Sequence, residues 1–216
     1  MKSFVLILGL SALFSSCTKD ALHGAGEKKI ELRNVGQFDV VHISGSREAE
    51  IIKSDKWRVE LSGYANLLAR FEARVENGNL RFEYPGVTNV SNDNIKIKIY
   101  APSVLGITQS GDTRMRVWEG FSGDRMNVEL SGKSRFEIGP NTFNYLRLDG
   151  SGETTIYARD AKAQKVELYL SGEAEAEVFA SEILKIDASG KAKVRYWGRP
   201  QDTDFKTSGD VVLEKQ

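Results

Sequence analysis

Apolar and polar residues alternate along most of the chain after its first 30 residues. Between Val128 and Ile138, the apolar residues occupy the even positions, and charged or polar residues occupy most of the odd positions. Successive side chains of a β-strand point to opposite faces, so this alternation predicts strands with one face in a core. Because the alternating runs are long and recur to the end of the sequence, an all-β fold is expected.

A Ser-Gly dipeptide recurs inside these alternating runs. Its serines are Ser110, Ser131, Ser151, Ser171, Ser189 and Ser208, at spacings of 21, 20, 20, 18 and 19 residues. A fixed period near 20 predicts a β-solenoid, in which equivalent residues of successive repeats stack about 4.8 Å apart. Parity places each serine outward and each glycine inward, where the coil bends. The residues two positions after each serine should form a charge ladder: Asp112, Lys133, Glu153, Glu173, Lys191 and Asp210.

The sequence before the repeats is less regular but still predicts strands. Weaker Ser-Gly pairs occur at Ser44 and Ser62, and Asn77-Gly78 between two alternating runs predicts a type I′ hairpin. Residues 66–70 can hold one helical turn. We therefore expect a single domain over residues 30–216, with an irregular, partly antiparallel β section at 30–103 that covers one end of the Ser-Gly repeats at 104–216.

The N-terminus carries a predicted export signal. The apolar run at 4–13 follows Lys2 and is too short to span a bilayer as a helix, so residues 1–16 are interpreted as a signal peptide. Ser15 and Ser16 lead into Cys17 in a pattern that resembles the lipobox of bacterial lipoproteins, which implies a lipid on the Cys17 thiol. Residues 17–29 are polar and are expected to form a tether. The lipid makes the membrane a partner. Because Thr18, rather than aspartate, follows Cys17, the same resemblance implies the outer membrane, in its periplasmic or its cell-surface leaflet.

Charge and composition exclude some partners. The chain has 30 basic and 30 acidic residues, and therefore no net charge to attract nucleic acid. Its 28% charged and 40% hydrophobic residues are typical of a soluble domain with a substantial core. With one cysteine, no intramolecular disulfide can form.

The sequence contains no pattern that predicts catalysis or a cofactor. His23 and His42 are the only histidines, which leaves no histidine pair or Cys-His set for a metal, and no Ser-His-Asp arrangement or phosphate-binding loop is found. We therefore expect no cofactor, no metal site and no enzyme. One enzymatic alternative stays open, a polysaccharide lyase or hydrolase, whose carboxylates would lie close together in the stack. The candidates are Asp149, Glu153, Glu173 and Asp187.

Outward aromatic residues favour a binding function instead. Tyr145, Tyr157, Tyr169 and Trp197 occupy predicted outward positions, and Trp118 lies near the first turn. Exposed tyrosine and tryptophan are common in protein and sugar recognition. The candidate residues for binding an extracellular glycan or protein are therefore Tyr145, Tyr157, Tyr169 and Trp197. A third alternative is a structural component of the cell envelope without a specific ligand.

An ordered series of short motifs resembles a known family. The series consists of VELSG at 59–63, VENGNL at 75–80, IKIYAPS at 97–103, the Ser-Gly repeats, and VRYWGRP at 194–200. It is similar to the auto-transporter adhesin head family known as the GIN domain, a family of unknown function, over residues 30–213. The resemblance implies a right-handed, single-stranded β-helix in an exported Gram-negative protein, with an adhesin-like role and no catalytic residues.

Overall fold

The computed structural model describes residues 20–216, so the signal peptide, Cys17 and the first tether residues lie outside the described part. The elements in chain order are β1 (Asp20–His23), β2 (Lys28–Asn34), β3 (Val40–Lys53), β4 (Arg58–Tyr64), α1 (Ala65–Leu68), β5 (Glu72–Glu76), β6 (Asn79–Glu83), β7 (Val87–Ser91), β8 (Lys96–Ala101), β9 (Gly106–Val117), β10 (Ser122–Ile138), β11 (Asn141–Trp197) and β12 (Asp202–Lys215).

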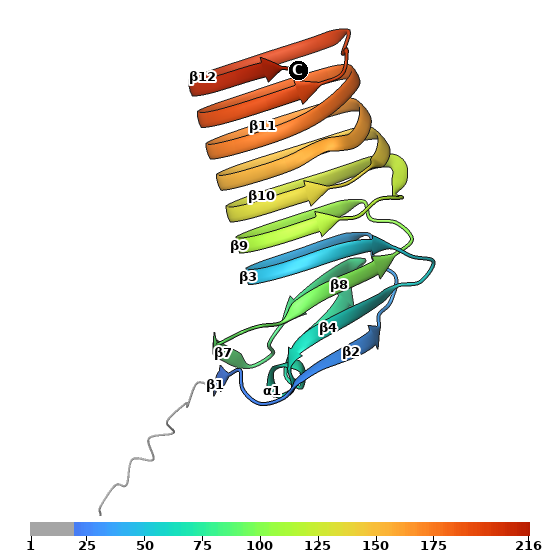
Figure 1. Cartoon of the computed structure of the whole chain (residues 1–216), viewed down its shortest axis with the longest axis vertical. Helices are drawn as coiled ribbons and strands as arrows, with labels where there is room; N and C mark the ends of the chain where they lie inside the picture. Colours follow the sequence, from blue (N-terminus) through green and yellow to red (C-terminus); the bar gives the residue numbers. More distant parts are fainter. Residues whose placement is uncertain (1–19) are drawn as a thin grey trace, which may run out of the picture.

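The all-β prediction is confirmed, and most of the sheet is parallel. Strands β3, β9, β10, β11 and β12 follow one another in a parallel stack, which Figure 1 shows with β12 at one end. Strands β8, β4 and β2 continue the sheet beyond β3, with antiparallel pairing between β8 and β4 and between β4 and β2. The partly antiparallel N-terminal section is therefore also confirmed.

The repeats stack residue on residue. Ser110 pairs with Ser131, Ser131 pairs with Ser151, and Ser189 pairs with Ser208. Ser44 pairs with Ser110, so the parallel stack begins with β3, which the sequence analysis grouped with the irregular section. Seven Ser-Gly bends thus lie above one another, and at about 4.8 Å per step they extend over roughly 30 Å. Their glycines are Gly45, Gly111, Gly132, Gly152, Gly172, Gly190 and Gly209.

The prediction that these glycines point inward is wrong. Gly132, Gly152 and Gly172 are exposed, and their φ angles of 76°, 92° and 94° lie in the left-handed region. The alternation itself holds on both sides of the bend, since Leu130 and Ser134 are buried. The glycine therefore lies at a bend of the chain, and not at a core position within a continuous strand.

Each bend separates two faces of the stack. We call the outward surface of the residues that precede the Ser-Gly dipeptides the pre-glycine face, and that of the residues that follow them the post-glycine face. The core lies between the two and is filled by buried residues from both, such as Leu148 and Ile156. The post-glycine part of β3 pairs with β8, and the pre-glycine part pairs with β6, so both layers continue into the N-terminal section.

The N-terminal section contains the predicted local structures. Asn77 and Gly78 both have positive φ, 49° and 74°, and they join the antiparallel strands β5 and β6 as a type I′ turn requires. The predicted helical turn is α1. Ser62-Gly63 is not a bend of the stack, because it lies inside the antiparallel strand β4.

Part of the predicted tether is ordered. Strand β1 pairs in parallel with β7, and the Asn92 side chain donates a hydrogen bond to the Gly24 carbonyl oxygen at 2.7 Å. Strand β2 begins at Lys28. The chain from Asp20 onward is therefore attached to the domain through the β1–β7 pair, a pairing that the polar, aperiodic sequence of this segment did not indicate.

Candidate functional site

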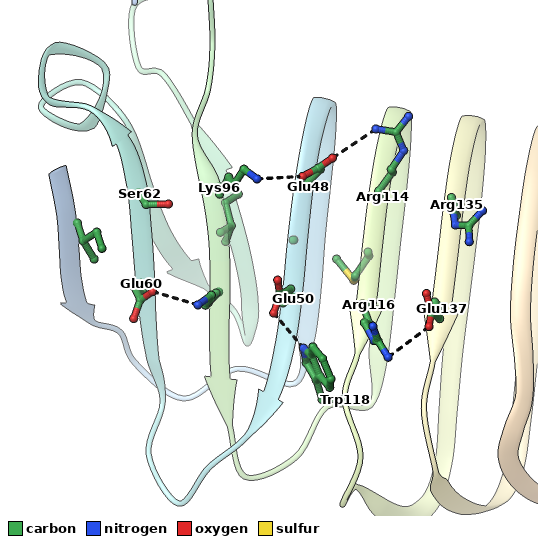
Figure 2. Close-up of a pocket in the computed structure, with 15 residues that line it drawn as sticks. Glu48, Glu50, Glu60, Ser62, Lys96, Arg114, Arg116, Trp118, Arg135 and Glu137 are labelled. Atoms are coloured by element: carbon green, nitrogen blue, oxygen red, sulfur yellow. Dashed lines mark hydrogen bonds and ion pairs between the residues drawn. The ribbon is translucent and has the colours of Figure 1, made fainter. Parts of the chain in front are cut away.

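Open grooves lie on both faces of the stack, and two of them contain candidate functional residues. The groove on the post-glycine face, which we call the Trp118 groove, has a volume of about 530 Å³ and crosses β4, β8, β3, β9 and β10 (Figure 2). Its lining side chains include Glu48, Glu50, Glu60, Lys96, Lys98, Arg114, Arg116, Trp118, Arg135 and Glu137. The groove on the pre-glycine face, the Tyr169 groove, has a volume of about 600 Å³.

Most charges in the Trp118 groove are paired across neighbouring strands. Glu48 forms ion pairs with Lys96 at 3.7 Å and with Arg114 at 3.3 Å. Two residues further along the same strand, Arg116 pairs with Glu137 at 3.5 Å (Figure 2). Such cross-strand pairs stabilise a sheet, and they hold the long side chains in defined positions along the groove.

Trp118 lies at one end of this groove. Its indole Nε1 donates a hydrogen bond to Glu50 at 3.0 Å, and the Arg116 guanidinium lies 4.0 Å from its ring centroid. The residue remains 36% exposed. A tryptophan oriented by both a hydrogen bond and a cation, yet still accessible to solvent, has the properties of a preformed stacking surface.

Tyr169 lies in the other groove, beside stacked serines and carboxylates. Asp149, Asp187, Ser151 and Ser189 share the lining with it. The Arg147 guanidinium lies 4.3 Å from the Tyr169 ring centroid and donates two hydrogen bonds to Asp149, at 2.8 and 3.0 Å. The groove therefore combines a fixed aromatic ring with several oxygen acceptors.

Tyr145 and Tyr169 are linked through one carboxylate. The Tyr145 hydroxyl donates a hydrogen bond to Glu167 at 2.7 Å, and the Tyr169 hydroxyl donates one to the same oxygen at 3.3 Å. Lys165 forms an ion pair with Glu167 at 2.7 Å. The network orients both rings, and it fixes Tyr169 along one side of the groove while Tyr145 lies outside the lining.

The same network shifts the pKa values of its members. The hydrogen bond from Lys165, followed by that from Tyr145, lowers the pKa of Glu167 to about 2. Burial, followed by the hydrogen bond to Glu167, raises the pKa of Tyr145 to about 12. At neutral pH Glu167 is therefore ionised and Tyr145 is protonated. A carboxyl group with so low a pKa is unsuited to act as the general acid of a glycosidase, which needs a raised pKa.

The four predicted aromatic residues do not form one surface. Tyr145 and Tyr169 precede Ser-Gly bends and lie on the pre-glycine face, whereas Tyr157 and Trp197 follow such bends and lie on the post-glycine face. All four are half-buried. Each ring has a cation over it, since Arg135 lies 4.6 Å from Tyr157 and Arg159 lies 5.3 Å from Trp197, and Lys165 lies 5.0 Å from Tyr145.

The four carboxylates of the enzymatic alternative are also divided. Asp149 and Asp187 line the Tyr169 groove, whereas Glu153 and Glu173 lie beyond the Ser-Gly bend. Glu153 forms an ion pair with Lys133 at 3.4 Å, and Glu173 forms one with Lys191 at 2.7 Å, as the charge ladder predicts. The expectation that all four lie close together is therefore wrong, because the bend places the two pairs on different faces.

The Trp118 groove was not predicted from the sequence. Half of its lining comes from β4, β8 and β3, whose pairing with the repeats was not predicted. One signal was available. Arg114 and Arg135 each follow a repeat serine by four residues, so the 20-residue period alone places them side by side.

Residues 20–216 contain neither a metal-ligand cluster nor a membrane-spanning helix. No group of three or more histidine, cysteine, aspartate or glutamate side chains there is arranged to hold a metal ion. No helix in this part of the chain is long and apolar enough to cross a membrane.

Comparison with known proteins identifies a family and several similar folds. Residues 37–200 match the family described as "Putative auto-transporter adhesin, head GIN domain". A "putative adhesin" from Bacteroides fragilis has a similar structure, with a TM-score of 0.76, 18% identity, and coverage of 90% of this chain and 100% of that one.

Two structures from Parabacteroides distasonis are also similar. A "putative adhesin" gives a TM-score of 0.62 at 17% identity, and a "Putative lipid binding protein" gives 0.57 at 16% identity. Each comparison covers 91% of this chain and 100% of the other. At these identities the likeness shows the fold alone. No curated protein is similar enough in sequence to match. The family and these three structures carry the names of adhesins or of a lipid-binding protein.

Proposed function

The chain belongs to the GIN-domain family of adhesin heads, and we propose that it is an adhesin-like binding domain held at the outer membrane by a lipid on Cys17. In this proposal the parallel stack is a right-handed β-solenoid that presents its two faces as binding surfaces. The parallel register at an offset near 20 residues supports the solenoid.

The observation that carries the binding function is the Tyr169 groove. Its aromatic ring is fixed from one side by Arg147 and through its hydroxyl by Glu167. Recognition sites typically combine such rigid aromatic anchors with polar groups that set the orientation of the ligand. Asp149, Ser151 and Ser189 supply these groups, and hydroxyl-rich ligands such as glycans match them.

The position of the N-terminal strands is consistent with a lipid anchor. Strand β1 lies at the end of the molecule opposite β12 (Figure 1), and it begins three residues after Cys17. Three residues span at most about 10 Å. A lipid on Cys17 would therefore hold the N-terminal section near the membrane and direct the Ser-Gly stack away from it.

Replacing Tyr169 by alanine tests the binding function. A panel of glycans and matrix proteins is screened with the chain carrying Cys17→Ser, and Tyr169→Ala is then measured on the ligands found. We expect an affinity loss of about tenfold or more, because an aromatic anchor typically contributes about 2 kcal/mol or more.

Tyr145→Ala is the matched control, since Tyr145 bonds the same oxygen of Glu167 from outside the groove. Equal losses from the two variants would mean that both act through Glu167, and the Tyr169 groove would not be the site.

The lipid anchor is tested by Cys17→Ser in cells. The variant should leave the detergent phase and become soluble, because stable attachment needs the acyl chains. A variant that stays with the membrane fraction would refute anchoring through Cys17.

A further inference from the structure

The Trp118 groove contains one pair of neighbouring like charges, which does not stabilise the sheet. Two rows of outward side chains cross it, the Arg114 row (Lys96, Glu48, Arg114, Arg135) and the Arg116 row (Glu60, Lys98, Glu50, Arg116, Glu137). Within these rows each neighbour has the opposite charge, with one exception. Arg114 and Arg135 lie side by side on parallel strands, where like charges destabilise the pairing.

Carboxylates within the groove do not neutralise this pair. Glu48 is shared between Arg114 and Lys96. The Arg135 guanidinium lies over the Tyr157 ring, and among residues 20–216 no carboxylate forms an ion pair with it. The Arg114 row therefore has three cations for one carboxylate, and two of the cations are arginines paired in register on adjacent strands.

Two arginines on adjacent strands are suited to bind a carboxylate or sulfate. Each presents a planar set of N–H donors that matches the oxygens of such groups, and the two residues pair in register on adjacent strands, whose backbones run about 4.8 Å apart. Contacts with Tyr157 and Glu48 limit the motion of the two side chains, so little conformational entropy is lost when an anion binds.

The rest of the groove suits a sugar better than a polyphosphate. Trp118 offers a stacking surface, and the Glu50 and Glu137 oxygens can accept hydrogen bonds from hydroxyl groups. With four carboxylates beside five basic residues, the groove as a whole has too little net positive charge to attract the closely spaced phosphates of a nucleic acid.

We propose that the Trp118 groove binds an acidic glycan, with a uronate or sulfate group on Arg114 and Arg135 and a sugar ring against Trp118. The inference rests on the proposed binding function of the domain but not on the Tyr169 groove. It names a ligand class, glycans that carry carboxylate or sulfate groups, for a site on the opposite face.

Binding of two acidic polymers and one neutral polymer tests the inference. Polygalacturonate supplies carboxylates, dextran sulfate supplies sulfates, and dextran supplies neither; each is titrated against the chain carrying Cys17→Ser. We expect binding of at least one acidic polymer, weakening as salt is raised, and at least tenfold weaker binding of dextran. The polymer that binds better identifies the acidic group.

Variants of single cations locate the site. Arg135→Gln should weaken binding of the acidic polymer by about tenfold or more, the loss typical of a charge-assisted hydrogen bond. Lys206→Gln is the matched control, because it removes the same charge from an exposed position on β12 outside the groove, and it should change affinity less than twofold.

Arg135→Lys should give an intermediate loss, since it keeps the charge but not the planar donors. If Arg135→Gln does not fold, Arg114→Gln replaces it, with the same expectation. Trp118→Ala should weaken binding of the acidic polymer without changing how strongly its affinity depends on salt.

Three results would overturn the inference. They are equal losses from Arg135→Gln and Lys206→Gln, equal binding of dextran, and no binding of either acidic polymer. If another ligand binds and depends on Tyr169, the proposed function stands while this inference fails. If the panel and the polymers all fail to bind, both fail together.

Discussion

At the scale of single residues, the bends of the stack depend on backbone that only glycine adopts readily. Gly152 has a φ of 92°, and a Cβ atom there would lie 2.8 Å from the carbonyl oxygen of Gly132 in the preceding repeat. Both the left-handed conformation and the close contact with the neighbouring backbone exclude a side chain. Ser151, beside it, is exposed, and its hydroxyl makes only a 3.5 Å contact with Leu130.

Gly152→Ala should therefore destabilise the fold by about 1–3 kcal/mol, while Ser151→Ala should cost less than about 0.5 kcal/mol. Gly123→Ala is the matched glycine control, because Gly123 has no positive φ and its Cβ would meet nothing within 4 Å. Denaturant unfolding measures all three variants. A Gly152→Ala variant as stable as Gly123→Ala would contradict the assigned bend.

Glu167 makes stability depend on pH. Folding lowers its pKa from 4.5 to about 2, so the folded state favours the ionised form. This contribution is complete above about pH 4.5 and is lost as the pH falls from 4.5 toward 2. Glu167→Gln should make the free energy of unfolding vary less with pH in that interval, and it should leave the pH dependence near pH 7 unchanged. Urea unfolding at a series of pH values measures this, and parallel profiles for the variant and the unaltered protein would refute it.

At the scale of elements, a strand's contribution depends on its place in the stack. Strand β12 lies at one edge of the sheet, with β11 on its only paired side. Phe205 of β12 pairs in register with the buried Ile186, yet it remains 38% exposed and packs against Tyr196 with 5.7 Å between ring centroids. Phe136 of β10, which has neighbouring strands on both sides, is fully buried.

The same substitution should therefore have different costs on the two strands. Phe136→Ala should lower the free energy of unfolding by about 3–5 kcal/mol, and Phe205→Ala should lower it by roughly half as much or less. The difference arises because a side chain on the edge strand buries less apolar surface when the protein folds. Thermal and denaturant unfolding compare the two variants. Equal costs would indicate that something covers β12 in solution.

At the scale of the whole molecule, the repeat makes the parallel stack modular. Residues that are 20 positions apart, such as Ser131 and Ser151, occupy equivalent places on consecutive repeats. Each repeat contacts mainly the repeats before and after it, and in such proteins stability is approximately a sum over repeats and their interfaces.

Deleting residues 151–170 should therefore leave a folded protein, since Ser171 then takes the place of Ser151 above Ser131. We expect the shortened protein to unfold cooperatively. Its free energy of unfolding should depend less steeply on denaturant concentration, because folding buries less surface. Deleting residues 151–160 is the matched control, which shifts every later repeat by half a period and places bends over straight segments. Circular dichroism and urea unfolding distinguish the two. Equal loss of structure in both would contradict the modular stack.

Much of this architecture follows from local patterns in the sequence. Period-two alternation determines the strands, the 20-residue period determines which residues stack, and Asn77-Gly78 determines a hairpin turn, because each depends on neighbours along the chain or on a strict repeat. The same information places Arg114 beside Arg135. Parity alone failed at the repeat glycines, because it assumes an extended backbone on both sides of each residue.

Only the tertiary structure decided how the two faces separate and what completes each groove. The sharp bend at each glycine divides Tyr157 from Tyr169 and Glu153 from Asp149, although each of these residues has outward parity. The pairing of β3 with β8 brings Glu48 and Lys96 beside the repeats from a region without the 20-residue period. Such contacts between segments of different pattern depend on packing in three dimensions, and no local signal in the sequence specifies them.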